Sequence, residues 1–305
     1  MMLDETARGV FTIAATPFLP DGALDAESLD QMVDFYLARG ATGLTILGMM
    51  GEAGKLTADE SATIISRICA RASVPVVVGV SAPGFAAIEA LSAIAMDKGA
   101  AGVMVAPPGN LRTDREIVTY YKTVAERLGE IPWVLQDFPL VTGVKIDADV
   151  ILRIVADCPG CVMLKHEDWP GLEKIAALRA ASDNGSRRIS ILCGNGGQFL
   201  LEEMIRGADG AMTGFAYPEM MASVVDLMTT GNEDRARDIF DAYLPLIRYE
   251  SQPGLGLAIR KYILAKRGAI RHPTVRAPGP KLSQATIAEI ETLIARQEAR
   301  LSALD

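Results

Sequence analysis

The sequence predicts a (β/α)8 TIM barrel followed by a C-terminal three-helix extension, and three observations support this prediction. Eight short apolar runs alternate with eight longer segments of helical period over roughly the first 230 residues. The apolar runs have no polar face, as expected of parallel strands that are buried on both sides. After residue 232 the apolar runs stop and three helical segments follow. We therefore expect a barrel over residues 1–232 and a helical extension over residues 233–305.

The individual elements follow from periodicity and from helix start signals. Thr57, with Glu60 three residues later, has the spacing of a capping box and marks the start of one helix. The strands are predicted at residues 10–18, 43–47, 74–80, 101–108, 132–139, 161–165, 189–194 and within 207–214. The helices are predicted at residues 25–39, 57–72, 85–98, 113–128, 147–157, 170–182, 197–206, 217–230, 233–250, 254–267 and 283–300.

A doubly wound open sheet is the alternative to the barrel. That fold often carries a GxGxxG turn after its first strand, where a dinucleotide binds. Here the first strand ends in TPFLPDG, which is no such turn. The pattern therefore favours the barrel.

Composition and charge argue against several kinds of partner. Half of the residues are apolar but only 6% are aromatic, which predicts an aliphatic core. The formal net charge of −8 gives the chain no electrostatic reason to bind nucleic acid or an anionic membrane. The N-terminus lacks the pattern of a signal peptide, and no apolar run reaches the ~18 residues of a spanning helix. We expect a cytoplasmic protein.

Two cysteines, Cys158 and Cys161, form a C-x-x-C motif that invites a zinc or redox interpretation. A zinc site would need a second ligand pair at suitable spacing, and the sequence has none. A redox motif should open a helix, whereas this one lies in a turn before a strand. We expect these cysteines to be structural and predict no metal.

The reactive group is predicted at the carboxyl end of the sixth strand. The carboxyl ends of all strands in such a barrel meet at one face, where the active site forms. Lys165 is the only lysine at a predicted strand end, directly after the apolar run CVML. Burial disfavours the ammonium form of a lysine, and a neutral amine condenses with a ketone to form an imine. A surface lysine, or one paired with Glu167 or Asp168, is the alternative.

Short motifs at the other strand ends complete a recognisable order. They are TPF and DG near the start, GMMGE after the second strand, TGV after the fifth, LKH at the sixth, and CGN and GADGAMTG at the last two. In this order the chain, from Gly9 to about residue 295, resembles the dihydrodipicolinate synthase / N-acetylneuraminate lyase family. The resemblance implies a Schiff-base lyase or aldolase that binds pyruvate or a related 2-oxo acid on Lys165, needs no cofactor, and is commonly a homotetramer.

The chain departs from the pattern of that family at the positions that handle protons and carboxylates. The motif after the second strand usually reads Gly-Thr-Thr-Gly-Glu, but both threonines are methionine here. Gln136, which cannot titrate, stands where the family has its acid/base tyrosine. Val141 replaces an arginine that holds the aldehyde in dihydrodipicolinate synthases, and Gly109 aligns with a second relay tyrosine.

The resemblance and the strand ends together define the candidate site. Lys165 and Gln136 are the expected catalytic residues, with Gln136 in contact with substrate or water. His166, Asp137 and Glu167 are the nearest titratable candidates for the missing proton relay, although alternation turns His166 away from the lumen if Lys165 points into it. The expected substrate-binding residues are Gly48, Met49, Met50, Asp137, Gly194, Asn195 and Thr213.

Three functions remain open on the sequence alone. The first is an imine-forming lyase or aldolase with a non-standard proton relay, which includes authentic 4-hydroxy-tetrahydrodipicolinate synthesis and dehydration of a sugar-derived 2-oxo acid. The second is a non-catalytic protein that binds a 2-oxo acid. The third is a phosphate-recognising barrel enzyme, because GNGG and TGFA follow the last two strands, where many barrels bind phosphate.

Overall fold

Eight parallel strands close into a barrel in the computed structural model of the chain, which describes residues 2–169 and 171–304. Each strand pairs with the next along the chain, and the last pairs with the first. This confirms the predicted (β/α)8 barrel. The strands are β1 (Gly9–Ile13), β2 (Gly43–Ile46), β3 (Val76–Gly79), β4 (Gly102–Val105), β5 (Trp133–Asp137), β6 (Cys161–His166), β7 (Ser190–Cys193) and β8 (Gly210–Ala211).

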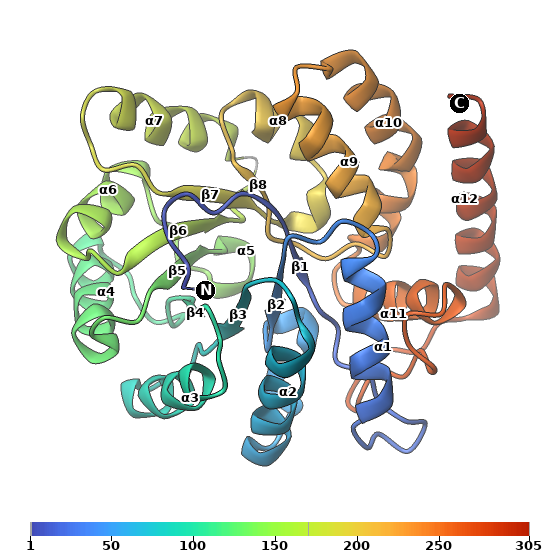
Figure 1. Cartoon of the computed structure of the whole chain (residues 1–305), viewed down its shortest axis with the longest axis horizontal. Helices are drawn as coiled ribbons and strands as arrows, with labels where there is room; N and C mark the ends of the chain where they lie inside the picture. Colours follow the sequence, from blue (N-terminus) through green and yellow to red (C-terminus); the bar gives the residue numbers. More distant parts are fainter. Residues whose placement is uncertain (1, 170, 305) are drawn as a thin grey trace.

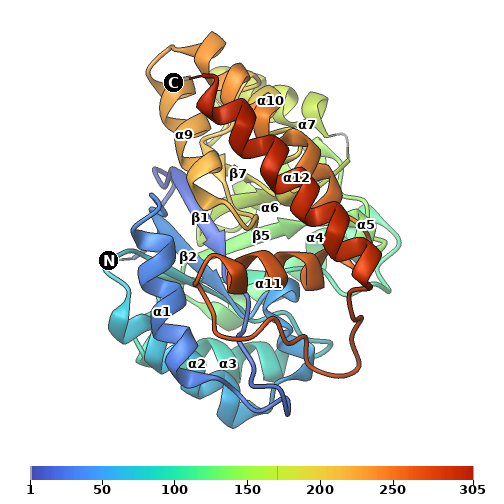
Figure 2. The ribbon, with the colours of Figure 1, turned by 90° about the vertical axis from the view of Figure 1, so that its right-hand side faces the viewer.

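Helices surround the strands and continue into the extension (Figure 1). Those of the barrel are α1 (Ala26–Leu37), α2 (Ala58–Arg71), α3 (Phe85–Asp97), α4 (Asp114–Leu128), α5 (Pro139–Thr142), α6 (Ala148–Asp157), α7 (Leu172–Asp183), α8 (Leu200–Ile205) and α9 (Pro218–Thr229). Those of the extension are α10 (Glu233–Glu250), α11 (Gly256–Lys266) and α12 (Gln284–Ser302). The 3-10 helices η1 (Met49–Gly51), η2 (Ala53–Lys55) and η3 (Asn195–Gly197) lie in loops. Helix α10 packs against both α9 and α12 (Figure 2).

Several strands are shorter than the apolar pattern predicted. β1 was expected to reach Phe18, but it ends at Ile13, and Phe18 forms an isolated bridge with Leu24. β5 ends at Asp137 because Pro139, which has no N–H to donate, begins α5. The apolar pattern runs beyond β1 because the residues that follow it, Ala14 to Phe18, are buried as well, whereas Phe138 and Pro139 after β5 are only partly buried.

Three helices begin two or three residues later than predicted, among them α11, which was expected from residue 254 and begins at Gly256. The helix expected at 197–206 is limited to α8, because Gly196 and Gly197 have φ values of 68° and 76°, in the left-handed region. The helix expected from Pro170 is α7, which begins at Leu172. Residue 170 itself lies outside the described part of the chain.

The barrel interior is filled by aliphatic side chains, as its composition predicted. These buried side chains form one interior cluster, to which Leu3 also belongs. The N–H of Leu3 donates to the carbonyl of Ala101 over 2.9 Å. Ala101 directly precedes β4, so the first described residues lie at the amino end of the barrel. The strands contribute Phe11, Ile13, Val77, Met104, Val134, Met163 and Leu192 to this cluster, and Met212, directly after β8, belongs to it as well.

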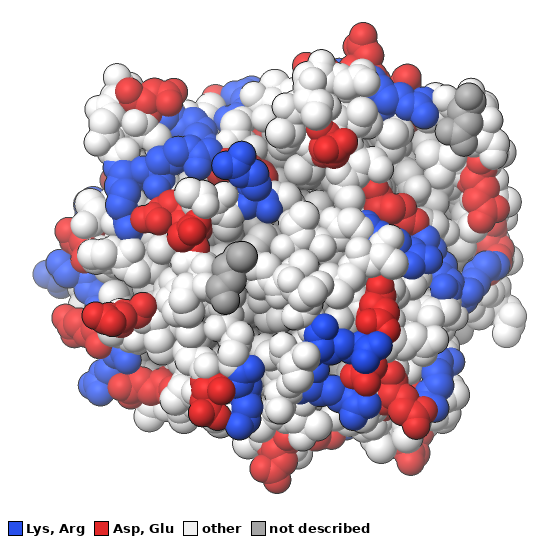
Figure 3. All heavy atoms as spheres, viewed as in Figure 1, with Lys and Arg blue, Asp and Glu red and all other residues white. Residues whose placement is uncertain are grey.

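The surface shows both signs of charge. On the face shown in Figure 3, basic side chains lie beside acidic ones. Ion pairs between described residues include those of Asp209 with both Arg179 and Arg188. Among the described residues, no helix has the length and apolarity to cross a membrane.

The predicted capping box at the start of α2 gives a stability test. The N–H of Glu60 donates to Thr57 Oγ1 over 3.1 Å, and the N–H of Thr57 donates to Glu60 Oε2 over 2.9 Å. Thr57→Ala should therefore lower the free energy of unfolding by about 1 kcal/mol, measured by urea denaturation. Thr63→Ala, on the exposed part of the same helix, should change it by less than about 0.5 kcal/mol. Equal losses in the two variants would contradict the role of the cap.

Candidate active site

Lys165 points into the barrel from the carboxyl end of β6. Met163, two residues earlier on the strand, belongs to the interior cluster, and strand residues two apart share a face. Lys165 is only 5% exposed, and its Nζ lies 3.0 Å from Oε2 of Glu167. Lys165 therefore points into the barrel, as imine chemistry requires. It also pairs with Glu167, which the sequence offered as the alternative to a reactive lysine.

A second group from β5 reaches the same carboxylate. Gln136 is the register partner of Lys165, and its Nε2 donates to Oε2 of Glu167 over 2.7 Å. All three side chains are buried. An amine, an amide and a carboxylate thus meet at one oxygen atom. The predicted pair of Lys165 and Gln136 is joined by Glu167, which the sequence identified only as one of three candidates.

Glu167 can take this position because residue 194 is a glycine. A Cβ atom on Gly194 would lie 2.1 Å from Cγ of Glu167. Asn195 Nδ2 donates to the carbonyl of Glu167 over 3.1 Å, and Thr213 Oγ1 accepts from the N–H of Gly196 over 2.8 Å. Gly194 and Asn195 thus contact Glu167 directly, and Thr213 holds the neighbouring Gly196. The contact of these three residues with substrate stays a prediction.

The expected substrate contacts after β2 lie on the other side of the barrel. A Cβ on Gly48 would contact side chains of Ile13 and Met104, which belong to the interior cluster. Met50 packs against that cluster, whereas Met49 is 43% exposed. The loop is therefore part of the wall of the lumen, and a role of its methionines in binding stays a prediction.

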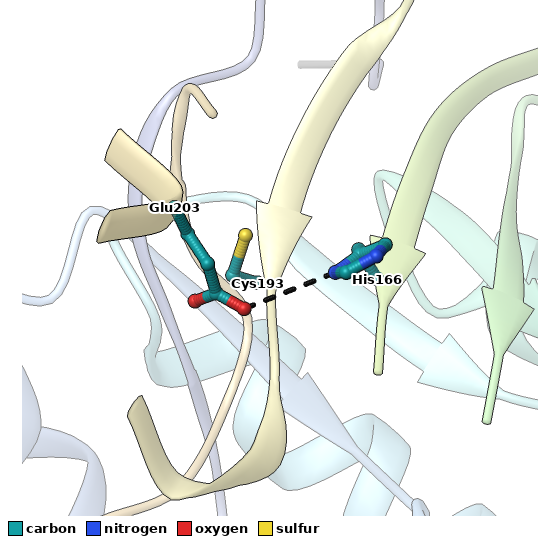
Figure 4. Close-up of side chains that lie close together, drawn as sticks. All are labelled: His166, Cys193 and Glu203. Atoms are coloured by element: carbon teal, nitrogen blue, oxygen red, sulfur yellow. Dashed lines mark ion pairs between the residues drawn. The ribbon is translucent and has the colours of Figure 1, made fainter. Parts of the chain in front are cut away.

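His166 faces outward, as strand alternation predicted. Its side chain is fully buried, and Nδ1 lies 3.8 Å from Oε1 of Glu203 in α8 (Figure 4). Burial raises the pKa of the Glu203 carboxyl, and the nearby imidazole opposes the rise. Cys193, the register partner of His166 on β7, completes the cluster. His166 therefore lies behind the strand that carries Lys165.

The donor atoms of His166, Cys193 and Glu203 lie within 4.8 Å of one another. Imidazole, thiolate and carboxylate are all zinc ligands, so this is the group of described residues best suited to hold a metal. The 3.8 Å between His166 Nδ1 and Glu203 Oε1 exceeds hydrogen-bond length, and neither ring nitrogen of His166 has a hydrogen-bond partner among the described residues. The absence of a metal stays a prediction.

Asp137 lies outside the lumen, in contrast to the predicted substrate contact. Because Gln136 points inward, alternation turns Asp137 outward, between β5 and α7. Its Oδ2 accepts from Lys174 Nζ over 2.7 Å, and the same Nζ lies 2.8 Å from Asp168. Burial raises the pKa of Asp137, and Lys174 opposes the rise. Burial also works against the charge of Lys174, but the two carboxylates outweigh it and raise the pKa of that lysine.

The sequence reasoning did not identify Lys174 or Glu203. Lys174 lies in α7 and Glu203 in α8, both outside the ring of strands. The sequence predicts these helices but does not show which strand residue each side chain contacts. No motif connects either residue with the strand end it contacts. A buried polar residue at an outward-facing strand position, such as Asp137, is the one signal that a partner is needed.

The buried pair of Lys174 and Asp137 gives a second stability test. Lys174→Met should lower the free energy of unfolding by roughly 3–5 kcal/mol in urea denaturation, because the buried carboxylate of Asp137 loses its cation. Lys122→Met is the control, since its pair with Asp157 is exposed and should be worth less than about 1 kcal/mol. A similar small loss in both variants would show that Asp137 does not depend on Lys174.

Comparison with known proteins identifies the family. The sequence model of the Dihydrodipicolinate synthetase family matches residues 6–297. The L-2-keto-3-deoxyarabonate dehydratase of Azospirillum brasilense is 30% identical over 304 residues, which cover 95% of this chain and 94% of that protein. The 4-hydroxy-tetrahydrodipicolinate synthase of Chlorobium luteolum is 31% identical over 293 residues, which cover 93% and 95%.

A solved structure agrees with these sequence comparisons. The dihydrodipicolinate synthase of Rhodopseudomonas palustris superposes with a TM-score of 0.96 at 52% identity. The match covers 97% of this chain and 99% of that one. Fold, lysine placement and sequence lead to the same assignment: the chain belongs to the dihydrodipicolinate synthetase family of Schiff-base lyases.

Proposed function

We propose that the protein acts on pyruvate or a related 2-oxo acid, with Lys165 as the nucleophile and Glu167 as the acid and base. The observation that carries this proposal is the 3.0 Å contact between the Lys165 amine and the Glu167 carboxylate inside the barrel. A neighbouring base is the arrangement that activates a nucleophile. The proposed reaction uses neither a metal nor an organic cofactor.

Glu167 carries protons in both directions in this scheme. It first takes a proton from the Lys165 ammonium, and the neutral amine attacks the keto carbon of the substrate. A proton of the attacking nitrogen then passes to the former keto oxygen, which becomes a hydroxyl. The carbinolamine that forms loses its hydroxyl as water when Glu167 returns the proton, which leaves a protonated imine. The regenerated carboxylate then removes a proton from the carbon beside the imine or from a substrate hydroxyl.

Gln136 holds this carboxylate and does not titrate. Its amide donates to the same Oε2 atom that faces the lysine, so the rotation of the Glu167 carboxyl is restricted. The usual tyrosine of the family is thereby replaced by two residues, an amide at its own position and a titratable group beside it. This replacement is the non-standard proton relay that we propose.

Two reactions are compatible with the scheme. Synthesis of 4-hydroxy-tetrahydrodipicolinate is disfavoured by Gln136, Met49 and Val141, which replace the family's relay and aldehyde-binding residues. Dehydration of a sugar-derived 2-oxo acid needs the imine, a base that removes the proton beside it, and an acid that returns a proton to the hydroxyl that leaves as water, and one carboxyl group can do both. A relative that matches over 94% of its length is named for such a dehydration. We therefore place the dehydration first.

Assembly and location stay predictions. We expect a homotetramer in the cytoplasm on the basis of the family resemblance. One solved relative, 25% identical to this chain, is described as a monomeric variant of dihydrodipicolinate synthase. Sedimentation velocity of the purified protein would decide between the two states.

Borohydride trapping tests the proposed nucleophile. Incubation with pyruvate and sodium borohydride should add the mass of the reduced imine to the peptide that contains Lys165, as seen by mass spectrometry. Lys165→Ala should show no such adduct. If neither pyruvate nor longer 2-oxo acids give an adduct, the non-catalytic binding protein becomes the better account. Protection by phosphate esters without any adduct would support a phosphate-recognising enzyme.

Two variants test the role of Glu167. Glu167→Gln keeps the shape but cannot carry a proton, so the rate of trapping should fall roughly 10²–10⁴-fold. Gly194→Ala should also slow trapping, because its Cβ would displace the Glu167 side chain. Gly84→Ala is the matched control, since a Cβ there meets nothing within 4 Å. A wild-type rate in Glu167→Gln would rule out Glu167 as the acid and base.

A further inference from the structure

The wall of the barrel opposite Lys165 is formed by the loop after β2. In the closed order of eight strands, β2 lies four positions from β6 in either direction. Gly48 and η1 therefore face the lysine across the mouth. A substrate bound as an imine on Lys165 extends toward this loop, so the position of the loop limits what fits.

Glu52 fixes the end of this loop. Its backbone has a φ of 56°, in the left-handed region, and its side chain is buried. Oε2 accepts from Lys55 Nζ over 2.9 Å and from the N–H of Arg276 over 3.0 Å. Oε1 accepts from Nζ of Lys261. Two of these three donors belong to the C-terminal extension.

Lys261 lies in α11 and is fully buried. Its Nζ also donates to the carbonyl of Thr274 over 2.8 Å and lies 4.5 Å from the centre of the Phe18 ring. Burial lowers the pKa of Lys261 to about 8, against the opposing effect of Glu52, and the positive charges of Lys55 and Arg276 lower it further. The lysine is thus held at this place at an electrostatic cost.

Arg276 ties the same loop to the extension from a second side. Its Nη1 donates to the carbonyl of Lys55 over 2.9 Å and to Glu60 over 2.8 Å. Its Nε donates to the carbonyl of Gly22 over 2.9 Å. Lys55 in turn donates to the carbonyl of Arg276 over 2.7 Å. The chain around Arg276 therefore crosses the loop between β2 and α2 and holds it.

The link from Glu52 to the lumen is short. The N–H of Glu52 donates to the carbonyl of Met49 over 3.0 Å, and the N–H of Gly51 donates to the carbonyl of Gly48 over 3.0 Å. Thr16 Oγ1 donates to the carbonyl of Gly51 over 2.6 Å. A displacement of Glu52 would therefore move the loop residues that contact the interior cluster.

We propose that Lys261 is a positioning residue for the substrate: through Glu52 it holds the loop from Gly48 to Gly51 where a 2-oxo acid on Lys165 fits. This inference rests on the proposed function. It makes the C-terminal extension part of the active-site architecture, although the sequence suggested a helical appendage. Lys261 itself does not touch the substrate.

The test compares two lysines of the same helix in the trapping assay. Lys261→Met should raise the pyruvate concentration for half-maximal trapping about tenfold, while the limiting rate changes less than about threefold. This split is expected because the loop affects binding and not the chemistry at Lys165. Lys266→Met removes an exposed pair with Glu291 and should leave both values unchanged.

A pH series provides a readout that loss of packing alone would not give. As the pH rises from about 7 to about 9, the Lys261 ammonium, whose pKa is about 8, loses its proton. The half-saturating pyruvate concentration of the wild type should then rise toward that of Lys261→Met. The ratio of the variant's value to the wild-type value should fall from about ten toward one. Glu52, Lys55 and Arg276 are the charged groups around Lys261, and all three are unchanged in the variant.

The outcomes separate the two proposals. If the wild type forms no adduct, the proposed function itself fails. If the wild type forms the adduct and a folded Lys261→Met has the same half-saturating concentration, the positioning role of Lys261 is overturned and the function stands. If Lys261→Met does not fold, Glu52→Gln replaces it, because it weakens the same link, and an unchanged half-saturating concentration in that variant overturns the inference.

Discussion

The buried contact between the Lys165 amine and the Glu167 carboxylate is the interaction on which the site depends. Taking two charges out of water is costly, and an apolar pair of similar volume is often at least as stable. The barrel nevertheless keeps this pair, with an added hydrogen bond from Gln136 and space left by Gly194. We infer that the pair serves chemistry, since stability alone would favour an apolar core.

The strands that carry the site have two functional faces. Lys165 and Gln136 point inward, whereas His166 and Asp137, one residue further along, point outward to α8 and α7. A catalytic group needs neighbours that fix its position to a fraction of an ångström. The outward-facing contacts meet this need, because Asp137 at the end of β5 pairs with Lys174 of α7, and His166 at the end of β6 lies beside Glu203 of α8.

The opposite wall of the lumen is held differently. The loop after β2 consists of the short 3-10 helices η1 and η2 and their flanking residues, which lie outside the sheet, so its position depends on side chains such as that of Glu52. The partners of Glu52 come largely from residues 261–276, which follow the whole barrel in the chain. The two walls of the site are therefore stabilised by separate parts of the molecule, strand register on one side and the extension on the other.

The sequence by itself determined the barrel, most of its helices, the lysine at the end of β6 and the outward direction of His166, because periodicity and alternation are local properties. Only the tertiary structure decided that Glu167 is the carboxylate beside the amine and that Asp137 belongs to α7. It also brought Lys174, Glu203 and Lys261 to their partners. Local patterns fix which face a residue occupies, but the packing of distant elements decides what that face meets.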